Sequence, residues 1–157
     1  MKKISAILFS IIVVMVSACA HSDSEPPSVA IGEISQQQLL SDYKYFQQSY
    51  RMSRLSEEEM IEIKRWPKNL HVDVYFGSWC HDSQREVPRF LKILNEKMTM
   101  SSRLIGLDYD KSEPNGQAKN HDIKYTPTFI VYIDNKEIGR IIERPKISIT
   151  ADISAML

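Results

Sequence analysis

The sequence predicts an α/β domain whose mixed β-sheet is flanked by helices. Strand-like and helix-like runs alternate between residues 71 and 121, which is typical of parallel strands joined by helical crossovers. Further along, two apolar runs meet at Asp134-Asn135, which predicts an antiparallel hairpin. The chain has 157 residues, 43% of them hydrophobic and 25% charged, enough for one domain with a substantial core.

The first residues have the pattern of an export signal. Lys2 and Lys3 precede an apolar stretch over 4–16, which ends in small residues. This stretch is shorter than the roughly 20 residues of a membrane-spanning helix, so an uncleaved membrane helix is the weaker alternative. We therefore expect a signal peptide over 1–18. A polar, proline-containing tether follows over 19–28, and the folded domain covers 29–157.

Two amphipathic helices are predicted before the first strand. Over 35–51, apolar side chains recur at helical spacing and form an aromatic stripe, which is most simply core packing. Ser56 and Glu59 have the spacing of a capping box, and Pro67 ends the helix that they begin.

The remaining elements follow from the alternation of apolar runs and turn signals. We expect strands over 71–76, 103–109, 129–133 and 137–142, and helices over 84–98, 116–121 and 148–157.

Cys80 is the candidate nucleophile of this chain. It lies where a predicted strand gives way to a helix, within Trp79-Cys80-His81-Asp82-Ser83. Backbone N–H groups and the helix dipole favour an anion there, which biases a thiol toward the reactive thiolate. The alternative is a small buried side chain without chemistry.

The neighbours of Cys80 allow several roles. Ser83 and a protonated His81 can donate hydrogen bonds to a thiolate, whereas Asp82 is a like charge that opposes ionisation. His81 can equally be a solvated loop residue, and Asp82 can simply favour the helix N-terminus.

Two separate motifs resemble the thioredoxin superfamily. Trp79-Cys80 before a helix is similar to its Trp-Cys-x-x-Cys motif, and Tyr125-Thr126-Pro127-Thr128 is similar to its cis-proline loop. Pro88 matches a proline that kinks the active-site helix. The resemblance covers 70–157, and reaches back to 29 if the leading helices replace the family's first strand and helix.

The resemblance implies a thioredoxin-like fold with an N-terminal helical extension. It also implies a groove that binds extended substrate, formed by Trp79, His81, Asp82, Thr126 and Pro127, with catalysis by Cys80 and Ser83. A cis Pro127 would place the Thr126 backbone opposite Cys80. More narrowly, the motif is similar to a group of bacterial thioredoxin-like lipoproteins with Trp-Cys-x-Asp-Ser.

Two residues depart from the thioredoxin pattern, and both affect the same step. Ser83 replaces the second cysteine, which resolves a mixed disulfide, and a hydroxyl cannot perform that reaction. Val74 stands where thioredoxins have a buried acid that assists proton transfer. Asp73 is adjacent, but strand alternation should direct it to the other side of the sheet.

Residues 16–19, Val-Ser-Ala-Cys, resemble the lipobox of bacterial lipoproteins. The resemblance implies that Cys19 carries the lipid and becomes the first residue of the mature chain. An aspartate after that cysteine favours the inner membrane in Gram-negative lipoproteins. Because Ala20 stands there, we expect a periplasm-facing chain, with the outer membrane favoured. Cys80 is then the remaining thiol.

These features predict a tethered monothiol protein that exchanges disulfides with a protein thiol or a low-molecular-weight thiol. A thioredoxin-fold binding module without catalysis is the alternative. The formal charge of +0 and the lack of a basic aromatic cluster disfavour nucleic acid. Zinc-ligand spacing is missing, and we expect no metal and no cofactor.

Overall fold

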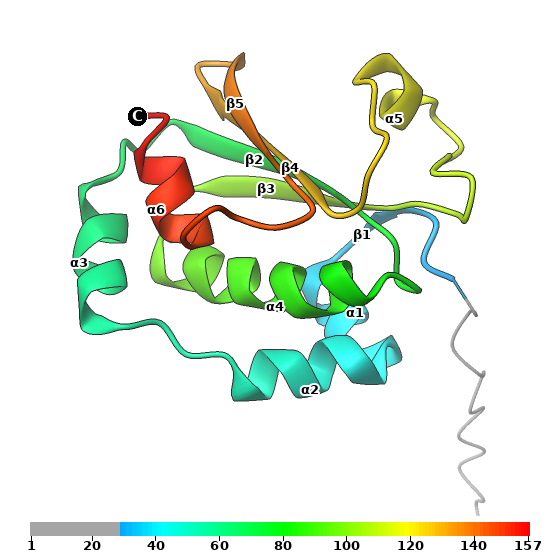
Figure 1. Ribbon diagram of the computed structural model, residues 1–157, viewed down its shortest axis with the longest axis horizontal. Helices are drawn as coiled ribbons and strands as arrows, with labels where there is room; N and C mark the ends of the chain where they lie inside the picture. Colours follow the sequence, from blue (N-terminus) through cyan, green and yellow to red (C-terminus); the bar gives the residue numbers. More distant parts are fainter. Residues whose placement is uncertain (1–28) are drawn as a thin grey trace, which may run out of the picture.

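A single five-stranded mixed sheet forms the centre of the computed structural model, which describes residues 29–157 (Figure 1). Its strand order is β1-β3-β2-β4-β5. Strands β2 and β3 are parallel, and the other neighbouring pairs are antiparallel. The predicted mixed α/β architecture is therefore confirmed. The strands are β1 (Gly32–Ile34), β2 (Leu70–Phe76), β3 (Ser101–Gly106), β4 (Thr128–Ile133) and β5 (Lys136–Ile142).

Most of the helices cover one face of this sheet (Figure 1). They are α1 (Gln36–Asp42), α2 (Lys44–Met52), α3 (Glu57–Arg65), α4 (His81–Glu96) and α6 (Ile149–Ser154), whereas α5 (Gln117–Asn120) lies over the other face. Helix α4 lies next to the sheet, and α2 packs outside it.

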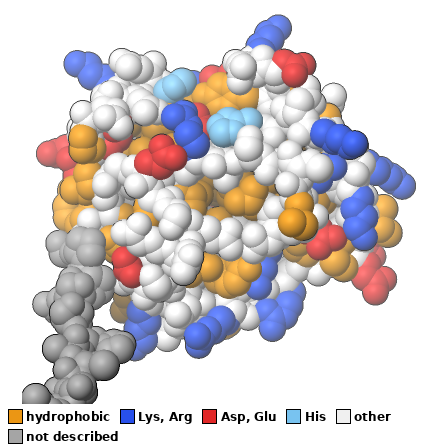
Figure 2. Space-filling model, turned by 180° about the vertical axis from the view of Figure 1, so that it is seen from behind, with side chains coloured by type: hydrophobic (Ala, Val, Ile, Leu, Met, Phe, Trp, Pro, Cys, Tyr) orange, Lys and Arg blue, Asp and Glu red, His pale blue; other side chains and the backbone are white. Residues whose placement is uncertain are grey.

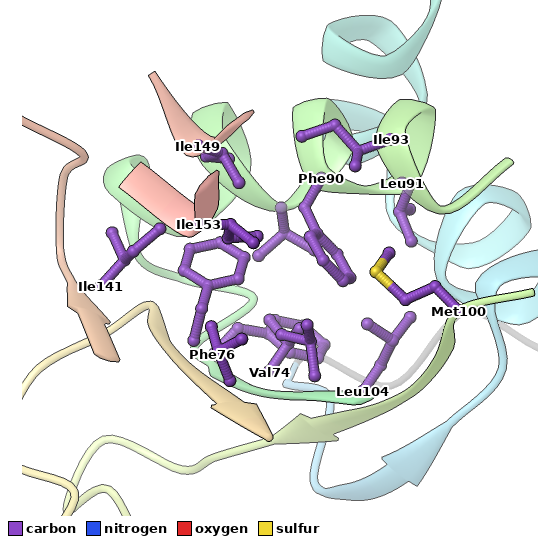
Figure 3. Close-up of a cluster of buried hydrophobic side chains, with 14 of the residues drawn as sticks. Val74, Phe76, Phe90, Leu91, Ile93, Met100, Leu104, Ile141, Ile149 and Ile153 are labelled. Atoms are coloured by element: carbon purple, nitrogen blue, oxygen red, sulfur yellow. The ribbon is translucent and has the colours of Figure 1, made fainter. Parts of the chain in front are cut away.

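The main core lies between the sheet and the layer formed by α4 and α6 (Figure 3). Val74 and Phe76 of β2 point toward Phe90 of α4 and Ile153 of α6, and all four side chains are fully buried. Burial of these apolar surfaces supplies the main force that holds α4 against the sheet. The end of β2 and the start of α4 are therefore fixed relative to one another.

The predicted helix over 35–51 is two helices. Tyr43 adopts an extended backbone conformation between α1 and α2. Leu39 and Phe46, one on each side of the break, are both fully buried. The change of chain direction lets both side chains reach the core, and tertiary packing thus overrides the continuous helical spacing.

Other elements differ from the sequence predictions as well, and the last helix is shorter, at 149–154 rather than 148–157. Strand β1 was not predicted, β3 covers 101–106 rather than 103–109, and α4 begins at His81 rather than residue 84. The short β1 pairs with β3 at Gly106, where the backbone of Ala30 approaches so closely that a side chain would collide with it.

No helix within residues 29–157 is long and apolar enough to cross a membrane. The predicted signal peptide, the tether and Cys19 lie outside the described residues.

Candidate functional site

Cys80 is the N-cap residue of α4, in the loop that leaves β2. Its backbone is extended, and its N–H donates to the Gly77 carbonyl at 3.0 Å. The residue is half-buried and its side chain makes no capping hydrogen bond. The first N–H groups of a 16-residue helix thus lie beside the thiol without a side-chain acceptor from the cap.

The loop around Pro127 lies directly opposite Cys80. The Thr126–Pro127 peptide bond is cis, as the sequence predicted. Cys80 Sγ donates to the Thr126 carbonyl at 3.1 Å. The residue that follows β5 holds this loop in place, because the Glu143 N–H donates to the Pro127 carbonyl at 2.7 Å. The structure therefore brings together Cys80, Thr126 and Pro127, which are distant in sequence.

Ser83 is fully buried in the first turn of α4 and bonds to the backbone instead of to Cys80. Its Oγ accepts the Gly77 N–H at 3.2 Å. No hydrogen bond between Ser83 and Cys80 is present among the described residues. A buried N–H needs an acceptor, and this demand explains why the hydroxyl faces Gly77 rather than the thiol.

Asp82 links the start of α4 to the segment that follows β5. Its Oδ1 accepts from Arg85 Nη1 at 2.8 Å and from Arg144 Nη2 at 3.2 Å. Burial acts to raise the pKa of Asp82, but the hydrogen bonds and charges of Arg144 and Arg85 outweigh it and the pKa is lowered. The negative charge that we expected to oppose a thiolate is thus offset by two guanidinium groups.

Trp79 and His81 flank Cys80 in the sequence and have different surroundings. Trp79 Nε1 donates to the Leu107 carbonyl at 3.2 Å, and the indole stacks on Tyr109 with ring centroids 5.1 Å apart. The indole also covers Gly77, where an added Cβ would lie 2.7 Å from it. His81 is exposed as the first residue of α4 rather than in a loop.

A model of the family described as thioredoxin matches residues 33–153. The chain belongs to this thioredoxin family. The match begins in β1, so it includes the leading helices as well as the part from residue 70 that carries the motifs. No curated protein sequence matches the chain.

Two solved structures share the thioredoxin-like fold of this chain. A protein of unknown function from Pseudomonas aeruginosa is 16% identical, with a TM-score of 0.51, over 76% of this chain and 70% of that one. An HIV epitope scaffold is 18% identical, with a TM-score of 0.52, over 76% and 72%. A thioredoxin from Fasciola hepatica is 22% identical, with a TM-score of 0.39, over 55% and 76%.

The position of the acid that thioredoxins bury is apolar here. Val74 lies in the main core, and Asp73 points to the other face of β2, as strand alternation predicted. In the upper part of Figure 2, histidine, cationic and acidic side chains gather beside apolar ones. Asp73 accepts from Arg103 Nη2 at 2.6 Å and bonds His71 at 2.8 Å. The sheet separates this ion pair from Cys80.

Sequence reasoning missed three contributors to the site. Arg144 pairs with Asp82 across 62 residues, the Leu107 carbonyl accepts from Trp79, and Ser78 Oγ accepts the Ala30 N–H at 2.9 Å. None of these pairs has a local sequence signal, because each depends on how strands and loops meet. Within residues 29–157 no three potential ligands converge as a metal site.

Proposed function

We propose that the chain performs thiol–disulfide exchange through a mixed disulfide on Cys80, in redox homeostasis of the cell envelope. The main support is one contact: Cys80 Sγ, at the N-cap of α4, lies 3.1 Å from the carbonyl that precedes cis Pro127. Membership of the thioredoxin family supports the same class of chemistry.

In the first step the Cys80 thiolate attacks one sulfur of a substrate disulfide. The Cys80–substrate S–S bond forms, the substrate S–S bond breaks, and the second substrate sulfur leaves as a thiolate. The thiol that donates to Thr126 loses this bond when it ionises. The first N–H groups of α4 lie beside the attacking sulfur without a side-chain acceptor from the cap.

Release from the mixed disulfide needs a thiolate from outside the chain. A thiolate of the substrate can attack the substrate sulfur, which regenerates Cys80 and rearranges disulfides without net redox change. A low-molecular-weight thiolate can attack instead, which leaves it joined to the substrate. Ser83 cannot resolve the bond and Val74 cannot move a proton, so isomerase-like or thiol-protecting work fits better than dithiol reduction.

An extended substrate would bind along the Thr126–Pro127 segment. Within residues 29–157 the Thr126 N–H makes no hydrogen bond, and in this binding mode it would donate to a substrate carbonyl. Trp79 and the exposed Tyr109 would bound the groove on one side. His81 and Asp82 would border it at the start of α4, and Ser83 would keep the loop in place through Gly77.

We propose that Cys19 carries a lipid that holds the domain at a membrane, periplasm-facing, with the outer membrane favoured. The support is the lipobox-like sequence before Cys19 and the residue after it, Ala20. Metabolic labelling with a palmitate analogue should mark the natural chain and fail to mark Cys19→Ser. Equal labelling would contradict the anchor.

The second candidate is a non-catalytic binding module that uses the same groove. It is favoured by Ser83, whose hydroxyl serves the Gly77 backbone, and by the lack of a resolving cysteine.

Reaction of the full chain with an aromatic disulfide reagent separates the two candidates. For exchange we expect Cys80 to react much faster than a free cysteine peptide, and a mixed disulfide to form that glutathione releases. Cys80→Ser, which keeps Cys19, is the control. A Cys80 thiol that reacts no faster than the peptide would favour the binding module.

A further inference from the structure

A groove lies between α2, the loop that follows it and α4, away from the Pro127 loop. One part of it has a volume of about 650 Å³, and a second part of about 340 Å³ shares Ser53 and Arg54 with the first. In Figure 1 these two helices run side by side on the helical face of the molecule.

Four cationic side chains line this groove without an acidic partner. They are Arg51 in the last turn of α2, Arg54 in the loop after it, and Arg89 and Lys92 on α4. None of the four forms an ion pair within the described part of the chain. The one lining acid, Glu96, lies 3.8 Å from Lys64. Like charges gathered here repel, so opposite charge would stabilise the arrangement.

Two of these cations are held in place by their surroundings. Lys92 Nζ lies 3.6 Å from the centroid of the Tyr50 ring, a cation–π contact across the groove. Asn95 Nδ2 donates to the Tyr50 hydroxyl at 2.7 Å and fixes that ring. Arg54 donates to the carbonyls of Arg51 and Ser53 at 2.5 and 2.8 Å. The charges of Lys92 and Arg54 are therefore positioned before any partner binds.

The groove also offers apolar contact. Tyr50, Leu55 and Met60 contribute to its walls, and Met52 beside it is 81% exposed. A groove lined by both apolar and cationic side chains fits a chain segment that presents an apolar face and an acidic face.

We propose that this groove docks an acidic, amphipathic segment of a partner protein. A polypeptide is favoured over an anionic membrane because the cations come from two elements on either side of a hollow. The inference goes beyond thiol exchange and does not depend on Cys80, although a docked partner would lie along the helix that Cys80 begins.

The test measures binding of the full chain to a fluorescently labelled peptide in which glutamate and leucine alternate at helical spacing. Binding is measured by fluorescence anisotropy at low and at high salt. We expect binding that weakens with salt, and no binding of the matching lysine–leucine peptide. The double variant R54E/R89E should bind about tenfold more weakly or worse. Cys80→Ser should bind like the natural chain, which separates docking from exchange.

The matched control is K119E/K136E, which makes the same change of net charge on exposed residues outside the groove. Equal loss in both double variants would overturn the proposal, because net charge alone would then explain binding. Binding to phosphatidylglycerol vesicles without binding to the acidic peptide would overturn it in favour of a membrane surface. Failure to bind either probe would also overturn it.

Discussion

Cys80 and Ser83 share one helical turn but contact different neighbours. The thiol donates to the Thr126 carbonyl, and the hydroxyl accepts the Gly77 N–H. In the proposed reaction the difference matters after the first attack, because only a thiolate can displace Cys80 from the mixed disulfide. Position 83 therefore decides whether the chain can release its substrate unaided.

Ser83→Cys should convert the chain to a dithiol reductant. We expect it to reduce insulin with dithiothreitol about tenfold faster or more than the natural chain, because the resolving thiol is then intramolecular. Turbidity of the precipitating insulin chain measures the rate. Ser101→Cys is the control, since it adds a thiol at the start of β3, at the end of the sheet away from Cys80. Equal rates for the natural chain and Ser83→Cys would show that resolution is not the limiting step.

Asp73 should contribute to stability in a pH-dependent way. Burial acts to raise its pKa, but His71 and Arg103 outweigh burial and lower it to about 2. Because this pKa lies below that of the unfolded chain, near 3.9, the contribution is full above that value. It is lost as the pH falls through 2, and it amounts to roughly 2–3 kcal/mol.

Asp73→Asn should lack this part of the acid dependence and should also be less stable near neutral pH, since Arg103 loses its buried partner. Urea unfolding at a series of pH values measures both effects. Asp110→Asn, at an exposed loop position, should behave like the natural chain. An unchanged pH slope in Asp73→Asn would contradict the assignment.

Among the elements, those with a strong internal pattern were predicted well. Helix α3, β2 and the β4–β5 hairpin agree with the sequence analysis to within a few residues, because their periodicity, caps and turn residues lie within the element itself. Strand β1 has three residues and exists through pairing with β3, more than sixty residues away, so its own sequence carries no signal. The break at Tyr43 and the Arg144–Asp82 pair likewise depend on contacts between distant segments.

The capping box of α3 gives a test at this scale. Ser56 Oγ accepts the Glu59 N–H at 3.2 Å, and Glu59 accepts the Ser56 N–H at 3.0 Å, as the spacing predicted. Ser56→Ala should lower the free energy of unfolding by about 1 kcal/mol. Urea unfolding measures the change, and Ser112→Ala, an exposed loop serine, should have little effect. Equal effects of the two variants would argue against the cap.

At the scale of the whole molecule, the first described residues of the domain lie next to the candidate site. The Ala30 N–H donates to Ser78 Oγ at 2.9 Å, two residues before Cys80. Residues 19–28 precede this point, and a segment of that length reaches at most about 35 Å. Under the proposed lipid anchor on Cys19, this reach limits how far the domain can lie from the membrane surface.

The lipidated chain should consequently react fastest with disulfides at a membrane. Vesicles that carry the lipidated chain and a lipid with a pyridyl disulfide headgroup should label Cys80 at least about a hundredfold faster than the same vesicles with unanchored Cys19→Ser at equal bulk concentration. Release of the pyridine thione measures the rate, and Cys80→Ser gives the background. A soluble pyridyl disulfide should react equally with both chains, because the anchor changes local concentration and leaves the thiol itself unchanged. Equal rates on the vesicles would show that the tether does not direct Cys80 to the membrane.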